Sequence, residues 1–397
     1  MTAYTCPNCQ TAEMRPFYSV QPVPVHSVLL LPTREEAVNF PTGNITLGFC
    51  EHCGFIANTD FDASLHDYSA RYEATQSYSP TFSKFSRRLA TDLINRHHLH
   101  HKRVLEIGCG QGEFLTELCE LGDNRGIGFD PAYVPERSPA NTDLITFVVD
   151  FYGEKYADQQ ADFVVCKMTL EHIDQTAGFV GTVRRTVGDQ PDTVVFFQIP
   201  NATRVLRDLA FWDVYYEHCS YFTRDSLAYL FRSQGFEVLD VWTDYDDQYL
   251  MIEARPGENA AQASAVLPPE ALDRIRADVA HFETRIPAWI DHWRGLVRDA
   301  AAQQQRVVIW GGGSKGVAFL TTLGIRDEIE YAVDINPHKN GMYMAGTGQQ
   351  TVLPEVLKGY RPDLIIVMNP IYCPEIQSMI DDMGVTAQLI PLEFTSD

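Results

Sequence analysis

The sequence lacks long apolar runs. None of the stretches in its 397 residues approaches the roughly 18 apolar residues that a membrane-spanning helix needs. The first residues also lack the basic region and apolar core of a secretory signal peptide. We therefore expect a cytoplasmic protein that has no membrane partner.

Basic residues are scarce relative to acidic ones. The chain has 31 Lys and Arg residues against 53 Asp and Glu residues, which gives a formal net charge of −22. A chain with this charge balance does not attract a polyanion. We therefore expect no nucleic-acid partner and look instead for a small-molecule ligand.

Cysteine is also infrequent, but four of the nine cysteines form two pairs near the N-terminus, Cys6-Pro-Asn-Cys9 and Cys50-Glu-His-Cys53. Two C-x-x-C pairs are typical of one tetrahedral zinc site, to which each pair supplies two thiolates. A disulfide framework is the alternative, but the other five cysteines are scattered and no export signal is visible. Four thiolates leave no coordination position for water. We therefore predict a structural zinc ion in a module formed by residues 1–66.

The rest of the chain divides into two α/β regions and a connector. Strand and helix signals alternate between residues 103 and 254, which predicts a doubly wound sheet in a domain of residues 67–256. A helix that starts near Pro80 precedes this sheet. Residues 257–304 have helical spacing and predict a connector of one or two helices. A second, smaller α/β domain is predicted for residues 305–397, with strands at 306–310, 331–334, 363–368 and 388–392.

A glycine-rich turn follows the first strand of the central domain, in the segment Glu106-Ile-Gly108-Cys-Gly110-Gln-Gly112. Its E-x-G-x-G-x-G spacing differs from the G-x-G-x-x-G pattern of dinucleotide-binding turns. Asp130 ends the next strand, where a carboxylate can accept hydrogen bonds from both hydroxyls of a ribose. An ordinary tight turn without a ligand is the alternative.

These motifs resemble those of class I methyltransferases, which bind S-adenosylmethionine (SAM). The resemblance implies that the glycine turn packs on the methionine and ribose parts of SAM, and that Asp130 binds the ribose. It also implies that Asp150, after the third strand, meets the adenine amine. The expected cofactor-binding residues are Glu106, Gly108, Gly110, Gly112, Asp130, Asp150 and Tyr78.

A second glycine loop, Gly311-x-Gly313-x-x-Gly316, has the dinucleotide spacing, and Asp334 follows 18 residues after its last glycine. Three interpretations are open. NAD binding would make the chain an oxidoreductase, but no hydride-transfer site is evident nearby. The loop is otherwise a structural turn, or its amides bind the phosphate of an acceptor, which we favour.

The segment from Trp212 to Phe222 is dense in titratable and aromatic residues. His218 is a candidate general base, and Glu217 or a tyrosine would set its pKa. His172 follows the fourth strand and is expected at the same edge of the sheet. A cluster of packed aromatic residues at a domain junction is the alternative.

The order of these parts resembles the zinc-containing sugar C-methyltransferases, which methylate keto-deoxysugars attached to a nucleotide. The matching pieces include both cysteine pairs, both glycine loops and the segments 76–82, 170–173, 215–218 and 334–341. The chain differs from that family at Tyr216, where a histidine is common, and in the turn at 368–372. The resemblance implies His218 as the base, accompanied by Glu217, Tyr215 and His172. The expected acceptor-binding residues are Asn201, Lys315, Asp334 and Lys339.

The sequence thus predicts an α/β SAM-dependent C-methyltransferase with an N-terminal zinc module and a C-terminal Rossmann-like domain. The expected reaction is base-assisted methylation of an enolate, formed from a nucleotide-linked keto sugar or a related small acceptor. An O- or N-methyltransferase acting on another small molecule is the alternative within the same class. An NAD-dependent oxidoreductase and a non-catalytic zinc scaffold are the alternatives from other classes.

Overall fold

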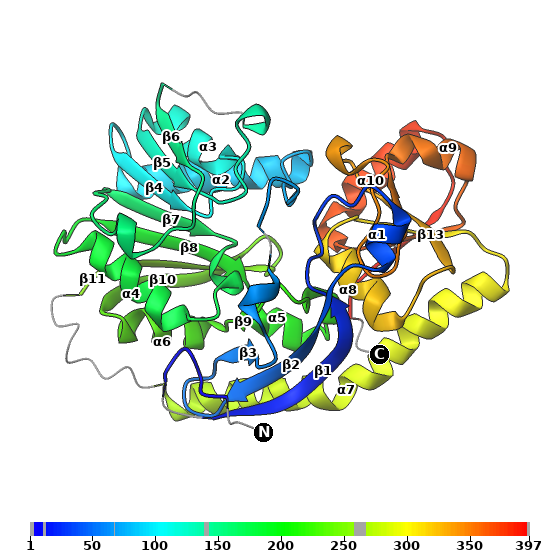
Figure 1. The fold of residues 1–397 in the computed structure, drawn as a ribbon, viewed down its shortest axis with the longest axis horizontal. Helices are drawn as coiled ribbons and strands as arrows, with labels where there is room; N and C mark the ends of the chain where they lie inside the picture. The colour runs from blue at the N-terminus through cyan, green and yellow to red at the C-terminus, as the bar shows by residue number, and fades with distance from the viewer. Residues whose placement is uncertain (1–3, 11–12, 67, 139–142, 258–266, 395–397) are drawn as a thin grey trace.

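Three β-sheets, of four, seven and five strands, organise the part of the chain that the structure describes (Figure 1). The structure is a computed structural model and describes residues 4–10, 13–66, 68–138, 143–257 and 267–394. Within these ranges, no helix is both long enough and apolar enough to cross a membrane. The seven-stranded and five-stranded sheets lie side by side, and the four-stranded sheet runs beneath them.

The seven-stranded sheet has the order β10-β11-β8-β7-β4-β5-β6. Its β11 strand is antiparallel to both neighbours, and the other pairs are parallel. The doubly wound sheet that the sequence predicts is confirmed, and β10 and β11 close it as an antiparallel pair. The strands are β4 (Arg103–Ile107), β5 (Arg125–Phe129), β6 (Ile145–Val148), β7 (Phe163–Lys167), β8 (Val194–Pro200), β10 (Phe236–Asp244) and β11 (Tyr249–Pro256).

Helices cover both faces of the seven-stranded sheet. On one face, apolar residues of α2 (Pro80–His97) and α3 (Glu113–Gly122) pack against alternate residues of the strands. On the other face, α4 (Thr176–Val187) and α6 (Arg224–Ser233) do the same. The predicted helix start at Pro80 is confirmed, because Ser79 caps α2 by accepting a hydrogen bond from the Phe82 amide. The short helix α5 (Ala202–Arg207) follows β8.

The four-stranded sheet has the order β1-β2-β3-β9 and is antiparallel throughout. Its first strands are β1 (Met14–Pro24), β2 (Thr42–Cys50) and β3 (Ile56–Asn58), and the short helix α1 (Arg34–Val38) lies between β1 and β2. The fourth strand, β9 (Ser220–Tyr221), comes from the central domain, directly after His218. The N-terminal module therefore pairs with the segment that carries the candidate base.

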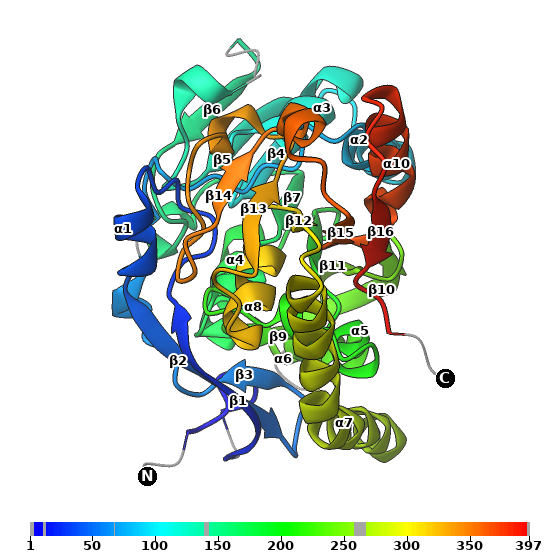
Figure 2. The same ribbon diagram turned by 90° about the vertical axis from the view of Figure 1, so that its right-hand side faces the viewer.

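The C-terminal sheet is parallel, with the order β14-β13-β12-β15-β16, as the predicted second α/β domain requires. A single long helix, α7 (Pro269–Ala302), forms the described part of the connector. It runs along the lower side of the molecule in Figure 1 and rises from the bottom toward the C-terminal sheet in Figure 2. Residues 258–266 of the predicted connector lie outside the described residues. The remaining elements are β12 (Val307–Trp310), α8 (Ser314–Leu323), β13 (Ile329–Val333), β14 (Gln350–Val352), α9 (Leu357–Tyr360), β15 (Leu364–Val367), α10 (Cys373–Asp382) and β16 (Gln388–Pro391).

Candidate active site and metal site

The four cysteine sulfurs of the two N-terminal pairs come together beside the four-stranded sheet. The Sγ atoms of Cys6 and Cys53 are 3.7 Å apart, as are those of Cys9 and Cys50, and all four lie within 4.8 Å of one another. A disulfide would bring two sulfurs to about 2 Å, whereas two thiolates of a tetrahedral zinc site are roughly 3.8 Å apart. Asn8 Nδ2 lies 3.6 Å from Cys53 Sγ and donates to it. The residues therefore fit a closed metal site.

A first cavity, of about 600 Å³, opens at the carboxyl ends of β4, β5 and β7. The glycine turn forms part of its wall. Gly108 has a φ of +69°, and a Cβ there would lie 1.9 Å from Thr169 Oγ1, so only glycine fits this position. Five of the predicted cofactor-binding residues line the cavity, namely Glu106, Gly108, Gly110, Asp130 and Asp150. Gly112 lies next to this lining, as the N-cap of α3.

The carboxylate of Asp130 is half-buried and holds the glycine turn in place. One of its oxygens accepts a hydrogen bond from the Gly110 amide at 2.9 Å, and the other accepts one from the Ala132 amide at 2.8 Å. Burial raises the pKa of Asp130, although both amide hydrogen bonds oppose this shift. Each oxygen keeps a second lone pair for a ligand hydroxyl.

Asp150 lies at the rim of the first cavity and is engaged by its own neighbours. It accepts hydrogen bonds from Lys155 and from Tyr156 Oη. The ammonium group of Lys155, together with the Tyr156 hydroxyl, holds the pKa of Asp150 below its ordinary value. The side chain is therefore ionised at neutral pH, in the state that accepts a hydrogen bond from an amine.

Three polar side chains converge in the floor of the first cavity, from Glu106 on β4, Lys167 on β7 and Gln198 on β8. The strand register places all three on one face of the sheet. Gln198 is fully buried, and neither atom of its amide has a hydrogen-bond partner among the described residues. Burial lowers the pKa of Lys167 to about 8 and raises that of Glu106 to about 8. The Lys167 ammonium group is the cation of this floor, and it could meet an anionic group of a ligand.

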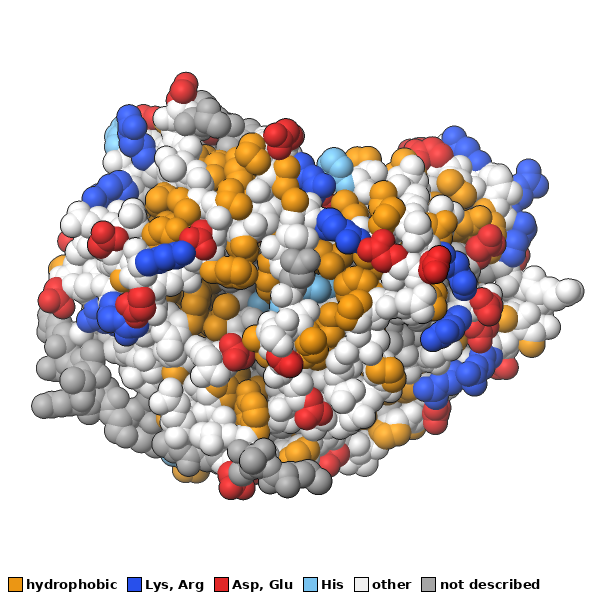
Figure 3. Space-filling model, viewed as in Figure 1, with side chains coloured by type: hydrophobic (Ala, Val, Ile, Leu, Met, Phe, Trp, Pro, Cys, Tyr) orange, Lys and Arg blue, Asp and Glu red, His pale blue; other side chains and the backbone are white. Residues whose placement is uncertain are grey.

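A second cavity, of about 300 Å³, lies between the central and C-terminal domains. Tyr72, Met168 and His172 line both cavities, so the two spaces adjoin at these side chains. Figure 3 shows histidine atoms among hydrophobic side chains in the hollow between the two domains. A ligand in the first cavity can therefore meet a different ligand in the second.

His218 lies at this boundary and lines the second cavity. Its Nε2 atom is 2.8 Å from the Tyr215 hydroxyl oxygen, and its ring lies edge-on to that of His172, with 4.9 Å between the ring centroids. The Nδ1 atom of His172 is 3.1 Å from the Tyr68 hydroxyl oxygen. Burial lowers the pKa of His218 well below its ordinary value and that of His172 to about 4. Both imidazoles are therefore neutral at physiological pH and can accept a proton.

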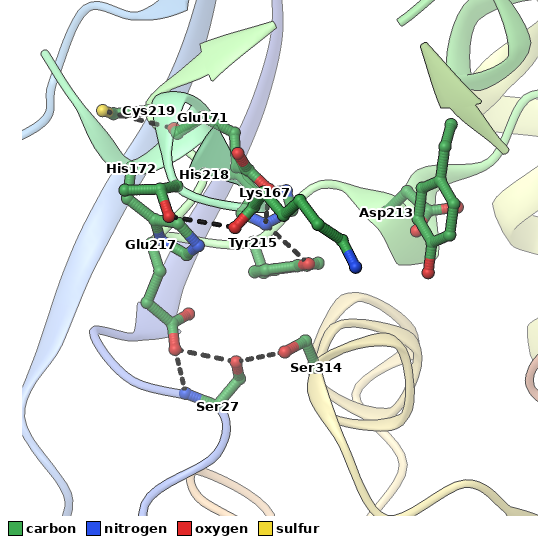
Figure 4. A network of polar contacts seen from close by, with 12 residues as sticks. Ser27, Lys167, Glu171, His172, Asp213, Tyr215, Glu217, His218, Cys219 and Ser314 are labelled. Atoms are coloured by element: carbon green, nitrogen blue, oxygen red, sulfur yellow. Dashed lines mark hydrogen bonds and ion pairs between the residues drawn. The ribbon is translucent and has the colours of Figure 1, made fainter. Parts of the chain in front are cut away.

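Glu217 points away from His218, toward the loop that follows β1 (Figure 4). Its carboxylate accepts hydrogen bonds from the Ser27 amide at 2.7 Å and from the Ser27 hydroxyl at 2.8 Å. The Ser27 hydroxyl oxygen is also 2.8 Å from that of Ser314, at the start of α8. Although burial alone raises the pKa of Glu217, the imidazole of His26, whose Nδ1 atom lies 3.7 Å away, and the hydrogen bonds from Ser27 hold it below its ordinary value. Glu217 thus joins three distant segments of the chain beside the candidate base.

The two lysines that the sequence analysis assigns to the acceptor each have a carboxylate partner. Lys315 pairs with Asp213, and burial lowers the pKa of Lys315. Lys339 lies 3.1 Å from a carboxylate oxygen of Asp334. Asp334 also accepts a hydrogen bond from the Gly312 amide at 3.0 Å, which repeats the contact between Asp130 and Gly110. All three predicted residues line the second cavity.

Asn201 and Tyr78 also line the second cavity. Asn201 caps α5, because its side chain accepts a hydrogen bond from the Thr203 amide. Tyr78 was predicted to bind the cofactor, but it does not line the first cavity. Its ring is 40% exposed and lies edge-on to His338 of the C-terminal domain. A contact between Tyr78 and the cofactor therefore stays a prediction.

In the second glycine loop, Gly316 has a packing role. A Cβ at this position would lie 2.5 Å from the Gly311 carbonyl oxygen, so glycine allows α8 to start close to β12. The loop residues Gly311, Gly313 and Ser314 nevertheless line the second cavity. The loop therefore allows α8 to pack close to β12, and it also lies where it could contact a ligand.

Four residues that the structure places at the site were not predicted from the sequence, namely Ser27, Glu171, Lys167 and Gln198. Lys167 and Gln198 are the polar residues at the ends of two apolar strands, which is a signal that the sequence offers. Glu171 directly precedes His172, which was predicted as a site residue. No local signal marks Ser27, because only tertiary contacts bring it to Glu217.

Two family models match the chain. A methyltransferase domain covers residues 82–241, and a C-methyltransferase C-terminal domain covers residues 257–387. The C-methyltransferase NovU of Streptomyces niveus is 28% identical over 289 residues, which is 69% of this chain and 67% of NovU. The protein is therefore a SAM-dependent methyltransferase. The C-terminal domain and the similarity to NovU support methylation at carbon.

Solved methyltransferase structures overlap with less than half of this chain. The 1,6-didemethyltoxoflavin-N1-methyltransferase of Burkholderia thailandensis is 18% identical, covers 46% of this chain and 84% of its own, and gives a TM-score of 0.35. The magnesium protoporphyrin IX methyltransferase of Synechocystis is 15% identical, covers 45% of this chain and 84% of its own, and also gives a TM-score of 0.35.

We predict that Lys167 holds the carboxylate of the methionyl tail of SAM. The substitution Lys167→Met should weaken the binding of S-adenosylhomocysteine by about tenfold to a hundredfold, because a buried charge-assisted hydrogen bond is lost. It should leave 5′-methylthioadenosine, which lacks the tail, with its wild-type affinity. Binding of S-adenosylhomocysteine to the wild type should also weaken above about pH 8, as Lys167 loses its proton.

Isothermal titration calorimetry of both ligands checks this prediction. The exposed Lys84 on α2 supplies the control substitution Lys84→Met. Equal losses for both ligands would indicate general damage to the cavity. An unchanged affinity for S-adenosylhomocysteine would show that Lys167 does not contact the tail.

Proposed function

We propose that this methyltransferase transfers a methyl group to the carbon next to a ketone, in a nucleotide-linked keto sugar or a related small enolisable acceptor. The observation that carries the proposal is the buried, neutral imidazole of His218 at the boundary of the two cavities. A C–H group beside a carbonyl is a weak acid, so methylation at that carbon needs a base. Methylation of an oxygen or nitrogen atom depends less on such a base than methylation at carbon does.

The two cavities support a division of roles. When bound in the first cavity, SAM supplies an electrophilic methyl group. In the second cavity, His218 would remove the proton from the acceptor, and the Tyr215 hydroxyl would orient the imidazole. Burial raises the pKa of Tyr215 well above its ordinary value, so its hydroxyl keeps its proton, and the hydroxyl oxygen can accept a hydrogen bond from Nε2–H, which leaves the lone pair of Nδ1 to take the proton. Glu217 would act indirectly, through the loop that it holds.

The second glycine loop supports a phosphate-bearing acceptor. Its residues line the second cavity together with Lys315 and Lys339, and it precedes α8, whose N-terminal amides favour an anion. Both lysines are paired with aspartates. A diphosphate would therefore have to share them with Asp213 and Asp334.

We also propose that the four cysteines bind a structural zinc ion. The sulfur separations fit tetrahedral coordination. The sheet beside the cysteines reaches the catalytic segment through β9, and the Asn58 amide donates to the Cys219 carbonyl at 2.9 Å. The zinc ion would therefore stabilise the backbone on which His218 lies.

The proposed reaction is tested by incubating the enzyme with SAM and a panel of nucleotide-linked keto sugars, beginning with thymidine diphosphate-4-keto-6-deoxyglucose. Mass spectrometry should show a gain of about 14 Da on one acceptor, and deuterium from the solvent should enter the carbon next to the ketone. A gain of mass on oxygen or nitrogen without exchange would contradict methylation at carbon. Saturable calorimetric binding of NAD, without binding of S-adenosylhomocysteine, would point to an oxidoreductase instead.

For the base, we expect His218→Ala to reduce turnover by about a hundredfold or more, with the affinity for S-adenosylhomocysteine unchanged. Steady-state kinetics and calorimetry check the two expectations. The exposed His100 provides the control substitution His100→Ala. Full turnover of His218→Ala, or lost cofactor affinity as the whole effect, would contradict the role of a base.

For the metal site, we expect elemental analysis to find about one zinc ion per wild-type chain and less in Cys50→Ser. The substitution should lower the melting temperature by about 5 °C or more, because a closed metal site contributes to folding. It should weaken acceptor binding while the affinity for S-adenosylhomocysteine persists. Cys373→Ser on α10 is the control, and equal effects of the two substitutions would contradict a zinc site.

A further inference from the structure

The carboxyl group of Glu171 is buried at the second cavity, and none of the roles described so far involves it. It lies on the 3₁₀ turn Leu170–His172 after β7, and its side chain is 1% exposed. Neither of its oxygens has a hydrogen-bond partner among the described residues. Its Oε1 atom is 4.0 Å from His218 Nε2, and Figure 4 draws the two side chains next to each other. Burying a carboxyl group without partners is costly unless the group stays neutral or meets a ligand.

The surroundings of Glu171 favour the neutral acid. The two nearby imidazoles, of His172 and His218, are themselves uncharged at neutral pH. Lys315 lines the same cavity, but it pairs with Asp213. Burial therefore raises the pKa of Glu171 to about 8. The other titratable groups that interact with it are Tyr68, Tyr72, Cys166, Tyr215, Cys219 and Tyr249.

The low basicity of His218 makes a second group necessary. An imidazole whose pKa lies well below its ordinary value is a weak base for a C–H group. The enolate must then be stabilised by a hydrogen-bond donor at the oxygen where negative charge develops. A carboxylic acid kept neutral by an apolar site can supply that donor at neutral pH.

We propose that Glu171 is this donor, and that its protonated carboxyl group binds the ketone oxygen of the acceptor and stabilises the enolate. The inference rests on the function proposed above. His218 takes the proton from carbon, the C–H electron pair forms the C=C bond of the enolate, and the negative charge moves to the oxygen. Glu171 donates a hydrogen bond to that oxygen and keeps its proton. The enolate carbon then forms a bond to the methyl group of SAM, the S–C bond to that methyl group breaks, and S-adenosylhomocysteine leaves with the electron pair. The ketone is restored, and His218 releases its proton to water.

Two substitutions at Glu171 separate this role from a packing role. Glu171→Gln keeps a hydrogen-bond donor of the same shape, so solvent deuterium exchange into thymidine diphosphate-4-keto-6-deoxyglucose should stay within about tenfold of the wild type. Glu171→Leu removes the donor and should slow exchange by about a hundredfold or more. The affinity for S-adenosylhomocysteine should be unchanged in both, which shows that the variants fold. The exposed Glu120 provides the control substitution Glu120→Gln.

The pH dependence supplies a readout that packing would not change. With S-adenosylhomocysteine saturating, exchange by the wild type should slow above about pH 8, because the Glu171 proton is lost there. Glu171→Gln should not show this decline. A decline that persists in Glu171→Gln would belong to Lys167 or Glu106 in the first cavity and would overturn the proposal, as would equal rates in Glu171→Leu and the wild type.

An infrared measurement distinguishes failure of this inference from failure of the proposed function. A protonated buried carboxyl group gives a C=O stretching band, and Glu106 should give one as well. The band of Glu171 should therefore appear in the difference between the spectra of the wild type and Glu171→Gln at pH 7. Absence of the band would overturn the proposal by itself. If wild-type enzyme catalyses neither exchange nor methyl transfer on any acceptor of the panel, the proposed function fails and the enolate role fails with it, even where the band is present.

Discussion

The site depends on the hydrogen bonds that the buried Glu217 carboxylate accepts from Ser27. These bonds, with the contact between Ser27 and Ser314, connect the loop after β1, the catalytic segment and the start of α8. A buried carboxylate requires such partners, so the three segments are coupled to one another. The second cavity lies among the same segments. The hydrogen bonds that the buried Glu217 carboxylate accepts therefore help to set the shape of this cavity.

Burial then determines the charge states around the two cavities. In the second cavity it keeps His172 and His218 neutral and Glu171 protonated, so a base and an acid coexist there at neutral pH. In the first cavity it leaves a lysine as the charged group of the floor. Different titratable groups therefore line the two adjoining cavities. The groups of the first cavity suit a charged methyl donor. The groups of the second cavity suit an enolisable acceptor.

Much of the fold could be predicted because its signals are local. Apolar strands that alternate with helices fixed the order of elements in both α/β domains, and the glycine spacing located the first cavity beside Asp130. The role of Glu217 could not be predicted in this way, because its partner Ser27 is 190 residues away and carries no motif. The contact of β9 with the N-terminal sheet was missed for the same reason, since a two-residue strand has no periodicity.

The sequence by itself determined the two cysteine pairs, the two glycine loops, the acids that follow the second strand of each α/β domain, and the candidate base. These features depend on residue type and on short spacings, which can be read directly from the sequence. Only the tertiary structure decided which charges are buried, and therefore which groups hold a proton. It also decided that Tyr78 lines the second cavity and that Glu171 lies near His218. Both outcomes follow from packing between distant segments, which lowers the local dielectric and shifts each proton equilibrium.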